Sequence, residues 1–205
     1  EGWRPPDDRI WHLTNEGKLL SGAINTGLLK VGTEFAAVLL GDDQLTIKAV
    51  QTLNTYAETF PAADFFHSSM RYIDGSGKEI RDSRESRPLA HMEDFLTHGV
   101  THLMCFRVAK ALAIGGVDEN LGLHGADDYD FPWTMWERGA KFQDVPETLY
   151  EYRIHHDHYR LTTHVPKEIQ KLELRKIFAK HGLPPDRIER EIAARESGYL
   201  DQALS

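Results

Sequence analysis

Short apolar runs alternate with amphipathic stretches along most of the chain. The runs 35–40 (FAAVLL) and 101–108 (THLMCFRV) have the length of buried strands, and 17–31 and 44–60 carry apolar residues at helical spacing. Strands that alternate with helices predict an α/β domain. We expect a mixed, mostly parallel sheet with flanking helices.

Other segments fit the same interpretation. The stretch 64–80 predicts a strand, a turn at 74–77 and a short return strand. A polar loop is expected at 81–88 and a helix near 89–96. Further strands are predicted at 9–14, 141–145 and 148–154.

The character of the sequence changes at about Val165. Two charged amphipathic segments follow, separated by Gly182 and the pair Pro184–Pro185, which ends one helix and starts another. We therefore divide the chain into a main domain at 1–164 and a helical C-terminal extension at 165–205. The extension is expected to be a solvated surface or a hairpin packed on the main domain, with an oligomer contact as a less favoured role.

Composition narrows the functional classes. A length of 205 residues allows one sizeable core, and a net charge of −8 argues against a nucleic-acid partner. The one cysteine, Cys105, cannot form an internal disulfide, which favours a reducing compartment. No apolar run approaches the roughly twenty residues of a membrane helix. These features predict a cytoplasmic protein, and a location at the inner face of the membrane stays open.

Two acids follow the most apolar predicted strand. Asp42 and Asp43 are expected at the carboxyl end of this strand, where α/β sheets bind ligands. Adjacent carboxylates favour a divalent cation, Mg²⁺ or Mn²⁺, shared with substrate phosphates. Histidines 155, 156, 158 and 164 could complete such a site. The alternatives are helix-capping acids and exposed loop histidines without ligands.

A second acidic group, GADDYD, opens a predicted helix at residues 125–130. Acids are favoured in a first helical turn by the helix dipole, so no chemistry is required there. If the group is functional, Asp127 would raise the pKa of Asp128 by repulsion, and the helix N-terminus would oppose that change. Trp133 and Trp136 either offer an aromatic face to a ligand or pack in the core, and the core is favoured.

The order of these motifs carries more information than any one of them. The segments TNEGKLLSGAINTGLLKVGTEFAAVLLGDD, AIGGVDENLGLHGADDYDF and RGAKFQDVPETLYEYRIHHD occur in that order. Together, over about residues 9–157, they resemble the inverting nucleotide-sugar glycosyltransferases of family 2. The resemblance implies a fold of the GT-A type, related to the Rossmann fold.

The resemblance assigns residues by position. It implies donor contacts by Asn15, Gly17, Asn25, Gly41 and Asp42, and a metal site at Asp42, Asp43 and His155. It implies acceptor contacts at Gly116 and Asp118, to which we add Trp133. Asp128 takes the position of the general base, beside Asp127. All these residues are present in the sequence at the stated positions.

The implied reaction moves a sugar from a nucleotide-diphosphate sugar to an acceptor hydroxyl with inversion. A divalent cation would neutralise the departing diphosphate, and Asp128 would accept the proton of the hydroxyl. The implied acceptor is a saccharide or a lipid-linked molecule, and the implied process is polysaccharide biosynthesis. The sugar, the nucleotide and the particular acceptor are not determined by the sequence.

Two departures from the family pattern keep alternatives open. Leu40 stands where the family has its first metal-motif aspartate, and the first strand–helix–strand half of the domain is missing from the sequence. Without that half, the strand at 35–40 would expose an apolar edge, so we expect a preceding segment or a homo-oligomer to cover it. The alternatives are a non-catalytic sugar- or nucleotide-binding remnant and a metal-dependent hydrolase that uses the cluster His155–His158.

Overall fold

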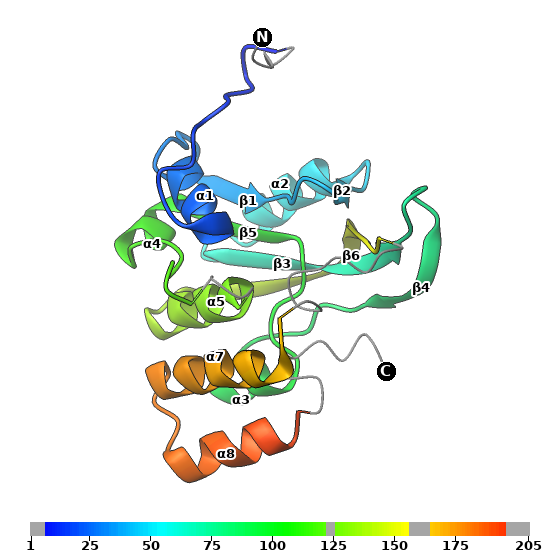
Figure 1. The fold of residues 1–205 in the computed structure, drawn as a ribbon. Helices are drawn as coiled ribbons and strands as arrows, with labels where there is room; N and C mark the ends of the chain where they lie inside the picture. The colour runs from blue at the N-terminus through cyan, green and yellow to red at the C-terminus, as the bar shows by residue number, and fades with distance from the viewer. Residues whose placement is uncertain (1–6, 122–125, 156–164, 196–205) are drawn as a thin grey trace.

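The computed structural model describes residues 7–121, 126–155 and 165–195 (Figure 1). The elements, in chain order, are α1 (Leu19–Leu28), β1 (Phe35–Val38), β2 (Gln44–Leu45), α2 (Ala49–Thr59), β3 (Phe65–Ile73), β4 (Glu79–Arg84), α3 (Met92–Thr97), β5 (Met104–Arg107), α4 (Val108–Ala113), α5 (Asp127–Glu137), β6 (Phe142–Arg153), α7 (Lys167–Lys180) and α8 (Pro185–Ala193).

The strands form one mixed sheet in the order β1-β5-β3-β6-β2, with β4 paired to β3. Strand β5 is antiparallel to both β1 and β3, and β3 is parallel to β6. Strands β1, β3 and β6 therefore run in one direction, with β5 opposed between the first two. The predicted α/β class is confirmed, although β3–β6 is the one directly paired parallel couple among the described strands.

Burial explains why β3 lies at the centre. Eight of its nine residues are buried, because helices cover both faces of the sheet in this region. Phe65 stacks on Phe142 of β6, with ring centroids 4.4 Å apart. The acidic helix α5 packs on this core through Phe131 and Met135. Its N-terminus is thereby fixed relative to the ends of the strands.

The C-terminal hairpin of α7 and α8 packs against α3 and α5 (Figure 1). Leu174, Ile177 and Phe178 of α7 are fully buried in one cluster with Phe95 of α3 and Trp133 of α5. The hairpin and the main domain thus share a hydrophobic core. Of the roles expected for the extension, packing on the main domain is the one the structure has.

Some elements differ from the sequence-based expectations. Residues 9–14 do not form a strand, and Trp11 is 68% exposed, because no neighbouring strand pairs with this segment. The helix expected from residue 44 begins at Ala49, since Gln44 and Leu45 pair with β6 instead. Ile47 is consequently fully exposed rather than part of an apolar helix face. The two strands expected between 141 and 154 are one strand, β6.

Strand β1 lies at the edge of the sheet and is only partly buried. The expectation that residues 35–40 form a buried strand is therefore wrong for the described chain. A hollow of about 330 Å³ lies between α1 and β1, lined by apolar side chains such as Leu20, Ile24 and Val38. Within the described residues, no helix combines the length and apolar character needed to cross a bilayer.

Candidate functional site

The turn after β1 places Asp42 and Asp43 in different environments. Asp43 is buried, and both its carboxylate oxygens accept hydrogen bonds, from the Tyr150 hydroxyl at 2.6 Å and from the Arg153 backbone N–H at 2.7 Å. Burial raises the pKa of the Asp43 carboxyl, and these two hydrogen bonds oppose the rise. Asp43 therefore ties the turn to β6.

Asp42 is open to solvent and faces His155. The distance from Asp42 Oδ2 to His155 Nε2 is 3.0 Å, and their side chains are 52% and 38% exposed. Arg153 holds the turn in place, because its Nε donates a hydrogen bond to the Asp42 carbonyl oxygen at 2.7 Å. The structure thus brings together an accessible carboxylate and an accessible imidazole, as two of the three predicted metal ligands.

Asp127 and Asp128 occupy the first turn of α5 and also differ in environment. Asp127 is buried, whereas the Asp128 side chain is 51% exposed. Burial raises the pKa of the Asp127 carboxyl to about 7, and the adjacent Asp128 charge adds to the rise. The sequence predicted a raised pKa at Asp128, whereas the structure shows the raised pKa at Asp127, because that carboxyl is the one removed from water.

His102 connects the two acidic groups, and sequence reasoning missed it. Its Nε2 lies 3.7 Å from Asp128 Oδ2, and its ring stacks on Tyr150 with centroids 5.1 Å apart. Tyr150 in turn donates to Asp43. A contact path Asp128–His102–Tyr150–Asp43 therefore runs from helix α5 to the turn after β1. The available signal was a histidine beside an otherwise apolar strand sequence.

The turn at residues 115–121 is held by α1. Asn25 Oδ1 accepts a hydrogen bond from the Val117 N–H at 2.8 Å, and Asn25 Nδ2 donates to the Val117 carbonyl oxygen at 2.9 Å. Gly116 has a φ of +79°, and a Cβ there would lie 2.2 Å from Asn25 Oδ1. Glycine is required at this position by both the backbone and the neighbouring amide.

Two further donor-site candidates lie against the same turn. Gly17 packs on the Glu119 carboxylate, which also accepts the Lys18 N–H at 2.9 Å. Asn15 caps this loop by accepting the Gly17 N–H at 2.9 Å. Asn15, Gly17 and Asn25 therefore gather at Gly116 and Asp118, whereas Gly41 lies in the separate turn with Asp42.

Trp133 lies in the core. It is fully buried, stacks on Phe95 with centroids 5.5 Å apart, and stacks on His181 at 4.1 Å. A side chain in this position offers no face to an acceptor sugar. The packing interpretation, which the sequence favoured, agrees with this burial, and the acceptor assignment of Trp133 is corrected.

The remaining histidine candidates, His156, His158 and His164, lie outside the described residues. Within the described part of the chain, no three His, Cys, Asp or Glu side chains gather closely enough to hold a metal by themselves. A cation at Asp42 and His155 would therefore need ligands from substrate or water.

The chain is similar to known proteins in its fold and not in its sequence. No protein-family model matches the chain, and no curated protein is similar in sequence. Solved structures do match. The crystal structure of S. aureus TarS 1-349 in complex with UDP-GlcNAc has a TM-score of 0.60 at 16% identity, covering 94% of this chain and 55% of that one.

A second match is the mannosyltransferase PcManGT from Pyrobaculum calidifontis, in complex with GDP-Man and Mn²⁺. Its TM-score is 0.50 at 17% identity, and the match covers 92% of this chain and 50% of that one. The chain thus spans about half the length of the structures it matches. Its fold is the GT-A-like fold of these glycosyltransferases, as the resemblance in sequence predicted.

Proposed function

We propose that the chain is the acceptor-side part of a metal-dependent, inverting glycosyltransferase that uses a nucleotide-diphosphate sugar. The observation that carries this proposal is the contact path from Asp128 through His102 and Tyr150 to the Asp42–Asp43 turn. On a GT-A-like fold, this path joins a candidate base to a candidate metal site. The binding of UDP-GlcNAc and GDP-Man by the matched structures supports the substrate class.

The side chains at the turn suit a hard divalent cation. Asp42 offers a solvent-accessible carboxylate, and His155 offers an imidazole nitrogen 3.0 Å from it. Mg²⁺ and Mn²⁺ commonly take one or two protein ligands and complete their shell with phosphate oxygens and water. We assign Asp42 and His155 as the ligands and Asp43 as their support, because both Asp43 oxygens already accept hydrogen bonds. A bound cation would neutralise charge on the departing diphosphate.

Asp128 is the base we propose. Its exposed carboxylate can reach an acceptor hydroxyl, whereas that of Asp127 is enclosed. Burial raises the pKa of the Asp127 carboxyl to about 7, so this enclosed group is only partly ionised near neutral pH. His102 faces the same carboxylate and can orient it. Asp128 then takes the proton as the hydroxyl attacks the sugar, which gives inversion in one displacement.

The free edge of β1 is expected to be covered in the working protein. Unpaired backbone groups and an apolar hollow beside α1 favour the addition of further β-structure there. A preceding segment or a second copy of the chain would serve, and the added structure would complete the donor side. Light scattering on the purified chain separates these cases, because a monomer excludes the second copy.

The test is sugar-nucleotide turnover by the full-length protein with Mn²⁺, comparing wild type with Asp128→Asn. We expect at least a hundredfold loss of turnover in the variant, while calorimetry shows unchanged nucleotide affinity. Equal turnover in both proteins would remove Asp128 from the mechanism. Absence of wild-type turnover with every donor would favour a non-catalytic binding protein, which Leu40 in the metal motif already makes the second candidate.

A further inference from the structure

Lys180, the last residue of α7, joins the C-terminal hairpin to two parts of the candidate site. Its Nζ lies 2.7 Å from Asp130 Oδ2 on α5 and 3.0 Å from Asp118 Oδ2 in the 115–121 turn. Both contacts are ion pairs that also satisfy hydrogen-bond geometry. One ammonium group therefore bridges the helix that carries Asp128 and the turn that carries Gly116.

The Asp130 end of this bridge is buried. The Asp130 side chain is 2% exposed, and its second oxygen lies 3.1 Å from Nε2 of His181, whose side chain is fully buried. The His181 ring in turn stacks on Trp133 of α5 with an interplanar angle of 3°. The contact from Lys180 restricts geometry strongly, because moving the ammonium group away would leave the buried Asp130 carboxylate without this cation.

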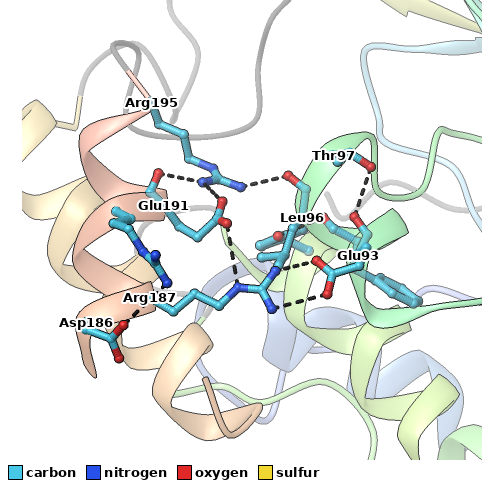
Figure 2. Close-up of polar contacts among 10 residues, drawn as sticks. Glu93, Leu96, Thr97, Asp186, Arg187, Glu191 and Arg195 are labelled. Atoms are coloured by element: carbon cyan, nitrogen blue, oxygen red, sulfur yellow. Dashed lines mark hydrogen bonds and ion pairs between the residues drawn. The ribbon is translucent and has the colours of Figure 1, made fainter. Parts of the chain in front are cut away.

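The hairpin itself is anchored on its other side by α3. Arg187 of α8 pairs with Glu93, and Arg195 donates to the Leu96 carbonyl oxygen at 2.7 Å (Figure 2). Arg195 also pairs with Glu191, which fixes its guanidinium. Because these contacts and the shared core hold the hairpin to α3, Lys180 extends from a fixed support.

The turn at 115–121 is thereby held from two sides. Asn25 of α1 bonds the backbone of Val117, and Lys180 of α7 bonds the side chain of Asp118. Asp130 lies two residues after Asp128 on the same helix. A shift at Asp130 would therefore carry Asp128 with it.

We propose that Lys180 is a positioning residue that sets the base helix α5 and the 115–121 turn relative to each other. The proposal rests on the proposed transferase function, since it assigns Lys180 the task of aligning Asp128 with the acceptor. Displacement of a catalytic group by about 1 Å can cost on the order of a hundredfold in rate. The C-terminal hairpin is on this view a part of the active site.

The first experiment measures kcat and acceptor KM for Lys180→Met and Lys180→Arg in the full-length protein. We expect Lys180→Met to lower kcat at least tenfold while donor affinity stays unchanged. Lys180→Arg retains the cation and should recover most of kcat. The matched control is Arg175→Met, which removes the α7–α8 ion pair to Glu189 and touches neither Asp118 nor Asp130. It should keep wild-type kcat.

A double variant separates positioning from folding. Lys180→Met leaves Asp130 as a buried charge, so Asp130→Asn is added to remove that charge. We expect Lys180→Met/Asp130→Asn to regain thermal stability and to keep the kcat defect. A return of kcat to the wild-type value in the double variant would overturn the proposal, as would a Lys180→Arg variant no better than Lys180→Met.

Hydrogen exchange provides a readout that needs no turnover. Lys180→Met should speed amide exchange at residues 117–121 at least tenfold, whereas Arg175→Met should leave it unchanged. Unchanged exchange at 117–121 in Lys180→Met would refute the bridge. If wild type turns over no donor, the transferase assignment fails, and this measurement still decides whether Lys180 holds the turn.

Discussion

Asp127 offers a quantitative test, because burial is the main cause that raises its pKa to about 7. A folded-state pKa above the unfolded value stabilises the fold at low pH, and this contribution is lost as pH rises through the folded pKa. The difference between a pKa of 3.8 and a pKa of about 7 corresponds to about 4 kcal/mol. This is the free energy of unfolding that an ionised Asp127 would cost the fold relative to a neutral side chain.

The perturbation is Asp127→Asn, which keeps the shape and removes the charge. We expect the variant and wild type to have similar free energies of unfolding near pH 4. The variant should become more stable by up to about 4 kcal/mol at pH 8, with most of the change between pH 4 and 7.

Urea denaturation at half-unit steps from pH 4 to 8 measures this difference in the free energy of unfolding directly. Asp186→Asn is the control, since that carboxylate is exposed on α8 and alters the net charge equally. A difference between Asp127→Asn and wild type that stays constant with pH would refute the assignment of a raised pKa to a buried carboxyl. Asp128→Asn should reduce the pH dependence of the free energy of unfolding only in part, because the Asp127 carboxyl stays buried.

Two further predictions concern the turn at Gly116 and the buried thiol of Cys105. Gly116→Ala should destabilise the fold by about 3 kcal/mol, because of the positive φ and the loss of the Asn25 hydrogen bonds. Gly115→Ala should cost about 1–2 kcal/mol, because an added Cβ there meets nothing within 4 Å. Equal losses of stability in thermal denaturation would contradict this reasoning. Cys105 is buried in β5, and burial raises the pKa of its thiol to about 12. A disulfide reagent at pH 8 should therefore label it only after unfolding. Rapid labelling of the native protein would contradict this burial.

Local signals in the sequence were sufficient for some elements and not for others. The start of α5 was predictable because three acids precede an apolar helix face, and this requires only nearby residues. Strand β3 was also predictable, because its apolar run and the following turn depend only on nearby residues. Residues 9–14 have the composition of a strand, but a strand also needs a partner, and none pairs with them in the described chain.

The sequence named the acidic residues of the candidate site but not the contacts between them. Asp42, Asp128 and His155 were named as candidates from motif order, and their roles stay predictions. His102 was missed because its place beside Asp128 and Tyr150 depends on the packing of α5 and β6 around the start of β5. Likewise, the hydrogen bond from the Asn25 amide to Val117, 92 residues later in the chain, was not predicted. Contacts at such separations have no periodic pattern in the sequence.

The two sides of the site differ in how completely they are built. On the proposed acceptor side, α1 bonds the 115–121 turn, and Lys180 of α7 pairs with the buried Asp130 of α5, so Asp128 and Gly116 are held in place. On the proposed donor side, Asp42 and His155 are accessible to solvent and lie near a sheet edge with an uncovered apolar hollow. A preorganised base is useful only if the donor is held equally well. If the chain is the proposed transferase, the structure that covers β1 would also contact the nucleotide, and sugar transfer would depend on that cover.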